Sequence, residues 1–374
     1  MARPRIGDED EPTAHVATNM VNMTRLTEFR AEHPDVFLVE ASELPALTSY
    51  LRARHWIDPE EDVRSATRPG DGNMNCTLRV QTGRRTVIVK QARPWVEKYD
   101  HIPAPWDRAL VEARFYRRIA GEPAVQRHMP RLLGVDERSR VLLLEDLGRG
   151  RDLTTIYDGD ALADQELDAL VDYLIALHGV RLTPVDRPGF ANREMRCLNH
   201  EYIFRLPLSP DNPVDLDGLT PGLGEAAATL TTDEAYVQTV TRLGAAYLAD
   251  GEVLLHGDYF PGSWLRTDDG VAVIDPEFCF VGDASVDLGV FIAHLVMVGQ
   301  SGQRIEDVVA RYHRVHPGSE SSLADCLRLA GVEIMRRLIG VAQLPLAIGI
   351  DRKRALLQLS RRLVLDPALE ALDG

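Results

Sequence analysis

The chain has few cysteines, and their spacing suggests no shared role. Cys76, Cys197, Cys279 and Cys326 are far apart, and no Cys-x-x-Cys motif is present. Zinc sites and disulfide frameworks usually show cysteines at close, regular spacings. We therefore expect buried or free thiols, and neither a zinc centre nor a cross-linked fold.

A long apolar segment is also missing. The N-terminus has no apolar core of the length that a signal peptide needs. The longest apolar stretch, residues 288–298, contains His294 and is much shorter than the roughly 20 residues that span a bilayer. These absences predict a soluble, cytoplasmic protein with no membrane partner.

Positive charge is in deficit. The chain has 57 Asp and Glu against 42 Lys and Arg, a net charge of −15. Such a charge repels the phosphate backbone of nucleic acids and anionic lipid surfaces. We expect a small-molecule or cationic ligand and no nucleic-acid partner, and a homodimer is left open.

The composition is otherwise that of an ordinary globular protein. The 374 residues are 45% hydrophobic and 26% charged. Because domains average about 150 residues, the length favours two units. Residues 1–30 are polar and without periodicity for most of their length, so we expect an N-terminal extension or the lead-in to a first helix.

Hydrophobic periodicity predicts a different character for the two parts that follow. The first part should hold strands at 77–80, 86–90, 130–136 and 140–144 and a helix at 106–119. After a glycine-rich linker at 148–151, the second should hold helices at 167–177, 288–298, 305–314, 323–342 and 354–364, and strands at 253–255 and 271–274. We predict an α+β fold with a small β-rich lobe, 31–147, and a larger, mainly helical lobe, 148–374.

Asp258 lies in a loop directly after the apolar strand at 253–255, in the segment His256-Gly257-Asp258. Loops on a rigid scaffold often carry catalytic residues. Taken alone, an aspartate at this place could equally be a turn or helix-cap residue. Its neighbours in the sequence decide between these interpretations.

A second strand ends in Asp275-Pro276-Glu277. Pro276 disfavours a helical conformation at the residue before it, and in an extended backbone residues i and i+2 point the same way. We therefore expect Asp275 and Glu277 to face one cation together. Two carboxylates without His or Cys favour Mg²⁺ with phosphate co-ligands. A solvated strand end is the alternative.

The order of the motifs is that of protein-kinase-like folds: a glycine-rich turn at 70–73, a strand lysine, a helix glutamate, a loop aspartate and a metal-binding strand end. In this scheme Lys90, held by Glu112, contacts ATP phosphates, and Asp258 orients an acceptor hydroxyl. A solvent-facing Lys90, and a surface ion pair of Glu112 with Arg108 or Arg114, are the alternatives.

From about residue 36 to 365 the chain resembles the aminoglycoside phosphotransferase and choline kinase superfamily, and most closely its methylthioribose kinases. Ser263 stands where most of these proteins have a metal-binding Asn, and methylthioribose kinases also have Ser there. The other matching motifs are Gly70-Asp71-Gly72-Asn73-Met74-Asn75, Val89-Lys90-Gln91-Ala92, His256-Gly257-Asp258, Asp275-Pro276-Glu277 and Asp287-Leu288-Gly289.

The resemblance implies a kinase that uses ATP and Mg²⁺ to phosphorylate a sugar hydroxyl, with Asp258 as the catalytic carboxylate. Its residues would fall into three groups. The nucleotide would contact Gly72, Asn73, Asn75, Lys90 and Glu112, with the backbone of Glu145 and Leu147 at adenine. The metal would be bound by Asp275, Glu277 and Ser263. The acceptor would contact Arg336, Arg337, Asp258 and Tyr259.

Two features bear on the acceptor. Tyr259-Phe260-Pro261 replaces the family's usual Leu-His-Thr, which predicts a bulkier, more aromatic wall. Arg336 and Arg337 are adjacent in a predicted helix, where neighbouring side chains differ by about 100°, so we expect at most one to point straight into a cleft.

Methylthioribose is the acceptor expected from the resemblance. An antibiotic or nucleoside phosphotransferase on the same scaffold is the alternative, since net acidity also suits cationic aminoglycosides. A nucleotide-binding pseudokinase is a third interpretation, which the joint presence of Lys90, Asp258, Asp275 and Glu277 disfavours.

Overall fold

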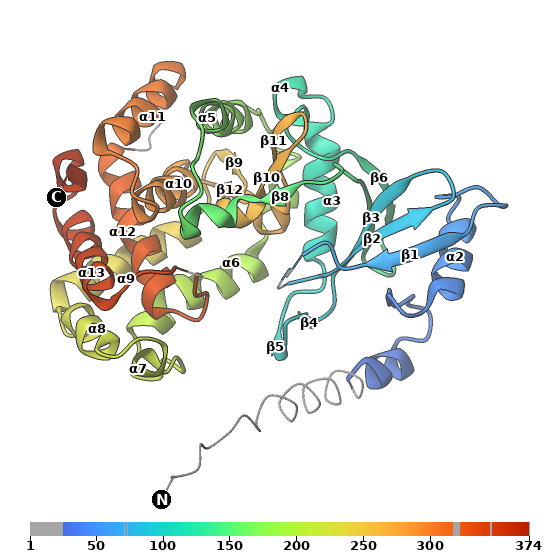
Figure 1. Cartoon of the computed structure of the whole chain (residues 1–374), viewed down its shortest axis with the longest axis horizontal. Helices are drawn as coiled ribbons and strands as arrows, with labels where there is room; N and C mark the ends of the chain where they lie inside the picture. The colour runs from blue at the N-terminus through green and yellow to red at the C-terminus, as the bar shows by residue number, and fades with distance from the viewer. Residues whose placement is uncertain (1–24, 71, 73, 317–321, 345, 374) are drawn as a thin grey trace, which may run out of the picture. The chain divides into compact units, whose positions relative to one another are not determined.

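The computed structural model describes residues 25–70, 72, 74–316, 322–344 and 346–373 (Figure 1). The chain divides into two compact units. Unit 1 comprises Met1–Trp106 and Leu133–Leu144, and unit 2 comprises Asp107–Leu132 and Glu145–Gly374. Unit 1 is built on a β-sheet and unit 2 is mostly helical, so the predicted α+β class is confirmed.

The main sheet of unit 1 has five strands in the order β1-β2-β3-β7-β6. The predicted hairpin is present, because β2 and β3 pair antiparallel with Leu78 opposite Val89 and Thr77 opposite Lys90. The strands are β1 Val63–Thr67, β2 Cys76–Thr82, β3 Thr86–Gln91, β6 Leu132–Asp136 and β7 Val141–Glu145.

One face of this sheet forms the core of unit 1 with helix α2, Leu44–Ala53. Leu47 and Leu51 of α2 are buried in the same cluster as Val87 and Val89 of β3. Since alternate residues of a strand face opposite sides, Lys90 lies on the other face of the sheet.

A smaller cluster lies beside the hairpin of β4, Trp95–Val96, and β5, Tyr99–Pro103. Phe29, from the helical segment 25–32, packs there against Trp95 with ring centroids 5.5 Å apart. The end of the predicted extension, residues 25–30, is therefore helical. Residues 1–24 lie outside the described part of the chain.

The helix predicted at 106–119 is α3, Arg108–Ile119, and it belongs to unit 2. It packs against α4, Pro123–Gln126, and against the 3-10 turns Arg187–Phe190 and Pro276–Phe278. The prediction placed this helix in the β-rich lobe, whereas its packing partners lie along the later chain and group it with unit 2.

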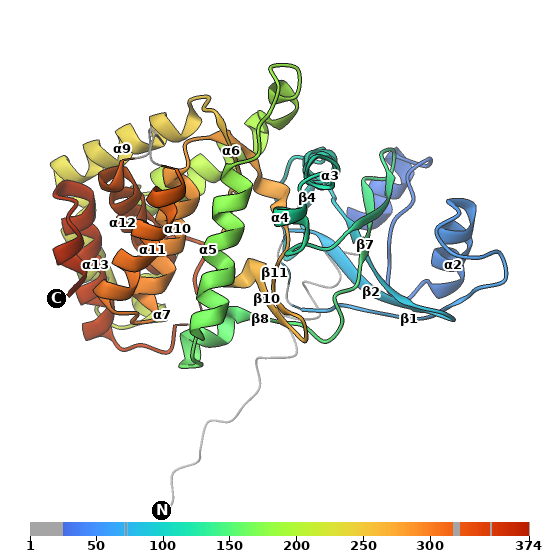
Figure 2. The ribbon, with the colours of Figure 1, turned by 90° about the horizontal axis from the view of Figure 1, so that it is seen from above.

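The centre of unit 2 is α10, Ser285–Met297, in which every residue except Val290 is buried. Figures 1 and 2 show α12, Leu323–Ile339, beside it. A Cβ on Gly289 would lie 2.6 Å from Cβ of Leu329, so glycine allows the close approach of α10 to α12. Around them lie α5 Asp164–His178, α11 Gly302–Val315 and α13 Ile350–Leu365.

A further group of helices follows α5 in the chain: α6 Arg193–His200 with a π-helical turn Glu201–Arg205, α7 Leu216–Leu219, α8 Leu223–Thr231 and α9 Glu234–Leu248. None of the helices in the described ranges is both long and apolar enough to cross a membrane. All four cysteines are free, as expected, and three of them are buried.

Two small sheets lie among the helices of unit 2. One has the order β11-β10-β8, and the other pairs β9 with β12. Both carry loops with predicted site residues. The strands are β8 Arg151–Asp152, β9 Val253–Leu255, β10 Trp264–Thr267, β11 Gly270–Val273 and β12 Phe280–Gly282.

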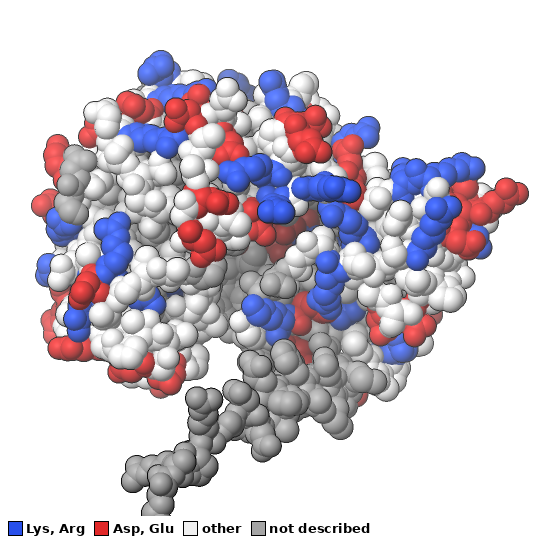
Figure 3. All heavy atoms as spheres, viewed as in Figure 1, with Lys and Arg blue, Asp and Glu red and all other residues white. Residues whose placement is uncertain are grey.

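On the face drawn in Figure 3, acidic and basic side chains are interspersed.

Candidate active site

The turn that carries Asp258 begins directly after β9, and the buried carboxylate of Asp287 accepts hydrogen bonds from its backbone. The backbone N–H groups of His256 and Gly257 donate to Asp287 at 2.7 and 2.9 Å. Gly257 has φ +84°, and a Cβ there would lie 2.1 Å from the carbonyl oxygen of Phe278. Only glycine fits this turn, because other residues would meet both backbone strain and a clash.

Asp287 is ionised although it has no exposed surface. Burial opposes the charge, but the hydrogen bond from His178 Nε2, at 3.2 Å, and the backbone donors outweigh it, and the pKa of Asp287 lies below its usual value. His178 is fixed in turn by the Tyr312 hydroxyl, 2.9 Å from its Nδ1. The turn before Asp258 therefore has a rigid anionic support.

His256 connects the two predicted catalytic loops. Its Nε2 lies 2.9 Å from the carbonyl oxygen of Ile274, which can only accept, so Nε2 carries the proton. Its Nδ1 is then the acceptor for the backbone N–H of Asp258, at 3.4 Å. One buried imidazole therefore holds the Asp258 loop beside the strand end at Asp275.

Asp258 faces two arginines at once. Its Oδ1 lies 3.4 Å from Nη2 of Arg336 and 3.5 Å from Nη2 of Arg337, and its side chain is 24% exposed. The expectation that at most one arginine would point into the site is wrong. Both side chains are long enough to bend toward Asp258 from adjacent helix positions, and Glu333 accepts a hydrogen bond from the Nε of each.

The Tyr259-Phe260-Pro261 segment contributes less to this surface than the sequence suggests. Tyr259 has no exposed surface, because it packs between Tyr173, Trp264 and Phe291 and its hydroxyl donates to the Leu170 carbonyl at 2.9 Å. The predicted contact of Tyr259 with the acceptor was therefore wrong.

Phe260 is the aromatic residue that faces the site. The Arg337 guanidinium stacks on its ring, with Cζ 4.4 Å from the ring centroid. The ring therefore helps to hold this arginine where it faces Asp258.

Ser263 and Asp275 approach each other through the β10–β11 hairpin. The backbone N–H of Ile274 donates to the Ser263 carbonyl at 2.9 Å, and the Ser263 hydroxyl donates to the Asp258 carbonyl at 3.1 Å. Ser263, Asp258 and the strand end at Asp275 are thus neighbours, as the predicted order of motifs requires.

The backbone around Asp275 differs from the prediction. Asp275 has φ 62° and ψ 52°, and Pro276–Phe278 forms a 3-10 turn, so the extended i, i+2 geometry was wrong. Glu277 is instead buried beside Arg108, whose Nε lies 3.2 Å from its Oε2. This arginine already balances the charge of Glu277.

The side chains at this place suit a hard divalent cation in part. The Asp275 carboxylate and the Ser263 hydroxyl are oxygen donors, which Mg²⁺ prefers. The carboxylate of Glu277 has Arg108 as its cation. Among the residues that the structure describes, no group of three or more His, Cys, Asp and Glu gathers as a metal site. Asp275 and Ser263 therefore stay predicted ligands, whereas Glu277 is paired with Arg108.

A family model described as "Phosphotransferase enzyme family" matches residues 65–323, more than half of the chain. The chain belongs to this phosphotransferase family. A methylthioribose kinase from Geobacillus sp. (strain WCH70) is 25% identical, over 88% of this chain and 90% of the relative. One from Geobacillus thermodenitrificans (strain NG80-2) is 27% identical, over 82% and 87%. The family resemblance stated from the motifs is confirmed.

A solved spectinomycin phosphotransferase, in complex with ADP and spectinomycin, is similar over 90% of this chain and 100% of its own, with 10% identity and a TM-score of 0.49.

Some of the residues predicted to bind the nucleotide lie in unit 1. Lys90 is only 3% exposed and Asn75 only 6%, whereas Gly72 is exposed. A solvent-facing Lys90, the alternative from the sequence, is therefore excluded. Asn73 lies outside the described residues.

The remaining predicted nucleotide residues belong to unit 2. Glu112 is 1% exposed, which excludes the surface ion pair considered for it. The backbone N–H of Glu145 donates to the Arg131 carbonyl at 2.9 Å, so its carbonyl is the group that it can offer to adenine. Its carboxylate pairs with Arg131, and that hydrogen bond lowers the pKa of Glu145. Leu147 is half-buried.

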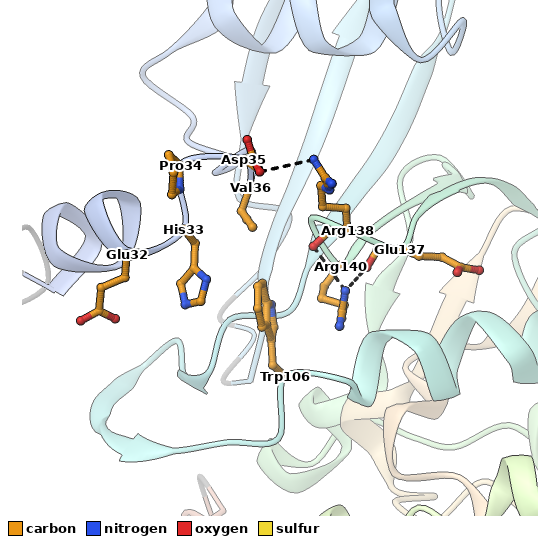
Figure 4. Close-up of a pocket in the computed structure, with 9 residues that line it drawn as sticks. All are labelled: Glu32, His33, Pro34, Asp35, Val36, Trp106, Glu137, Arg138 and Arg140. Atoms are coloured by element: carbon orange, nitrogen blue, oxygen red, sulfur yellow. Dashed lines mark hydrogen bonds and ion pairs between the residues drawn. The ribbon is translucent and has the colours of Figure 1, made fainter.

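A pocket of about 520 Å³ in unit 1 contains none of the predicted phosphotransferase residues (Figure 4). Its basic side chains are already paired within the protein. Arg138 lies 3.7 Å from Asp35, and Arg140 donates to the carbonyls of Glu137 and Arg138. We assign no function to this pocket.

The residues behind the two arginines were not predicted from the sequence. Glu333 lies three and four positions before Arg336 and Arg337, the spacing at which helix side chains meet, so the helix pattern could have identified it. Its next neighbours, His294 and Tyr157, lie far away in the sequence, and no local pattern indicates them.

Proposed function

We propose that the chain is an ATP- and Mg²⁺-dependent cytoplasmic kinase that phosphorylates a hydroxyl group of 5-methylthioribose. The observation that carries the proposal is the approach of Asp258 Oδ1 to both Arg336 and Arg337 at 3.4 and 3.5 Å. Relatives named methylthioribose kinase, 25–27% identical over 79–88% of this chain, support the choice of acceptor. Homodimer formation stays a prediction.

In this proposal Asp258 orients the acceptor hydroxyl and accepts its proton. The transition state of phosphoryl transfer is loose, so positioning and charge neutralisation supply most of the rate enhancement. The two guanidiniums beside Asp258 would stabilise the charge of the transferring phosphoryl group. His256 and Asp287 would keep the loop of Asp258 in place.

The other predicted residues take their roles in the same proposal. Mg²⁺, when bound, would neutralise the phosphates of ATP. Asp275 and Ser263 would hold it, and Glu277 would take part only if its pairing with Arg108 changed. Gly72, Asn73, Asn75 and Lys90 would bind the phosphates of the nucleotide, Glu112 keeps its predicted role of holding Lys90, and the backbone of Glu145 and Leu147 would bind adenine.

An antibiotic or nucleoside phosphotransferase is the second candidate. The net charge of −15 favours a cationic acceptor such as an aminoglycoside. The local charge argues the other way. The two positive charges of Arg336 and Arg337 balance the carboxylates of Asp258 and Glu333, so this cluster offers a cationic aminoglycoside no net negative charge. A neutral sugar is the better fit.

An ADP-release assay with Mg-ATP tests the proposal against methylthioribose, other 5-modified riboses, nucleosides and aminoglycosides. We expect strong turnover with methylthioribose. A better nucleoside or aminoglycoside acceptor would replace the proposed substrate. ATP binding without ADP release for any acceptor would support a nucleotide-binding pseudokinase.

Asp258→Asn tests the mechanism. The amide keeps the size of the side chain but cannot accept the proton, so kcat should fall about 100- to 10,000-fold while KM for ATP changes little. Asp250→Asn is the matched control, because Asp250 also pairs with two arginines, Arg193 and Arg196, on an exposed loop. The control should keep wild-type kinetics. An Asp258→Asn enzyme with near-normal kcat would refute the mechanism.

A further inference from the structure

Glu333 lies behind the two arginines of the proposed acceptor site. Its side chain is 2% exposed, and each carboxylate oxygen takes one arginine: Oε2 accepts from Nε of Arg336, and Oε1 accepts from Nε of Arg337 at 2.7 Å. With Nε bound from behind, the Nη2 atoms of both guanidiniums remain directed at Asp258. One buried carboxylate therefore sets the orientation of two neighbouring side chains.

The charges of this cluster balance. Two arginines stand between Asp258 on one side and Glu333 on the other. Burial opposes ionisation of Glu333, but the two guanidiniums outweigh it and hold the pKa of Glu333 well below its usual value. Without Glu333, both arginines would have Asp258 as their nearest carboxylate.

Two more buried side chains hold Glu333. A carboxylate only accepts, so His294 Nε2 donates to Glu333 Oε1, at 3.1 Å. That leaves Nδ1 as an acceptor, and the Tyr157 hydroxyl donates to it at 2.6 Å. Burial lowers the pKa of His294 to about 4, which keeps the imidazole neutral, and the two hydrogen bonds set its tautomer. A series of hydrogen bonds thus runs from Tyr157 through His294 and Glu333 to the two arginines.

We propose that Glu333, held by His294 and Tyr157, is a positioning residue that keeps the guanidiniums of Arg336 and Arg337 turned toward the acceptor and prevents them from closing on Asp258. The inference rests on the proposed kinase function and deepens it. If Glu333 is neutralised, the arginines pair more tightly with Asp258, which then becomes a poorer proton acceptor.

The test is steady-state kinetics of Glu333→Gln with Mg-ATP and methylthioribose, beside the wild-type enzyme. Because a displacement of about 1 Å at a catalytic group can cost about 100-fold, we expect kcat to fall about 10- to 100-fold. KM for ATP should stay within about two-fold, since the hydrogen bonds of Glu333 to residues that the structure describes go to the two arginines and His294. A variant with wild-type kcat would overturn the inference.

A double-mutant cycle separates positioning from simple loss of stability. If Glu333 acts through Arg336, the combined Glu333→Gln/Arg336→Ala enzyme should be much less impaired than the product of the two single effects. Effects that multiply would overturn the inference.

Asp136→Asn is the matched control. Asp136 is a buried carboxylate of unit 1, its side chain is also 2% exposed, and it pairs with Arg54 and the Tyr50 hydroxyl. This variant should lose thermal stability and keep wild-type kcat per folded molecule. If its kcat falls as far as that of Glu333→Gln, the effect is structural and the inference is wrong.

Tyr157→Phe covers the case in which Glu333→Gln does not fold. It removes the hydroxyl that donates to His294, at the far end of this series of hydrogen bonds. We expect kcat to fall about 3- to 10-fold from the loss of one hydrogen bond. Unchanged kcat in this variant would overturn the positioning chain. A wild-type enzyme inactive toward every acceptor would overturn the proposed function and this inference with it, whereas an active wild type equalled by Glu333→Gln would overturn the inference alone.

Discussion

His294 is a buried histidine whose protonation is coupled to the folding of unit 2. Burial lowers its pKa to about 4, and the hydrogen bond to Glu333 only partly offsets this. An unfolded chain would protonate the same imidazole near pH 6.5. Between about pH 6.5 and 4 the unfolded chain therefore binds a proton that the folded chain excludes, so stability is complete above this window and falls as the pH falls through it.

Replacement of His294 by Gln should remove this acid sensitivity. The amide can keep both hydrogen bonds, through its NH₂ to Glu333 and its oxygen to Tyr157. Urea unfolding at about pH 7 and about pH 5 should show that the wild type loses up to about 1.4 kcal/mol more per pH unit than His294→Gln. Because both proteins contain all the other histidines, the difference between their losses reports on His294 alone. Equal losses would show that His294 does not titrate in this window.

At the scale of residues, the sequence predicted where the site residues lie in the fold better than it predicted their backbone conformation. The short strand and glycine before Asp258 were enough to predict a strand-end loop, and β9 has the bounds expected for it. For Asp275, the left-handed backbone was not foreseeable, since nothing local favours φ 62° over an extended strand end. The partner of Glu277 is Arg108, 169 positions earlier, and only the fold brings them together.

The turn between β9 and Asp258 depends on one glycine, and its replacement tests that element. Gly257 and Gly270 both have positive φ, so alanine should cost about 1 kcal/mol of backbone strain at each. At Gly257 the new Cβ would also meet the Phe278 carbonyl oxygen at 2.1 Å, whereas at Gly270 nothing lies within 4 Å.

Thermal unfolding of Gly257→Ala and Gly270→Ala measures the difference. We expect Gly257→Ala to be the less stable by about 1–3 kcal/mol, the usual cost of forcing extra volume into a packed site. It should also lower kcat, because the turn carries Asp258, while Gly270→Ala keeps wild-type kcat. Equal stability of the two variants would mean that the turn relaxes without cost.

At the scale of elements, amphipathic periodicity predicted the helices that pack on one side. α5, α11 and α13 are found close to their expected ranges. The membership of α3 was not predictable in this way, because its apolar face is the same whichever partner covers it. The π-helical turn Glu201–Arg205 and the four-residue α7 are too short or irregular for a period to be read. In contrast, α9 buries Tyr236, Val240 and Tyr247 at helical spacing, so its pattern could have been read from the sequence and was missed.

At the scale of the whole molecule, net charge and local charge favour different acceptors. The chain carries −15 overall, but on the face drawn in Figure 3 acidic and basic groups are interspersed, and the proposed acceptor site presents two arginines beside Asp258. Charges in solution are screened beyond about 10 Å at 0.1 M salt. Adjacent site charges should therefore dominate over the distant surface.

Salt dependence distinguishes the two acceptor classes without knowledge of the bound complex. For a neutral sugar such as methylthioribose, KM for the acceptor should change less than about two-fold between about 50 and 500 mM salt, because no long-range attraction is there to be screened. If an aminoglycoside is instead the acceptor, attraction by the net charge of −15 should be screened, and KM should rise several-fold over the same range. ATP is kept saturating at each salt concentration, so that screening of its own charge does not enter. A steep rise in KM for methylthioribose itself would contradict this prediction, because it would show that a screened charge dominates binding of the neutral acceptor.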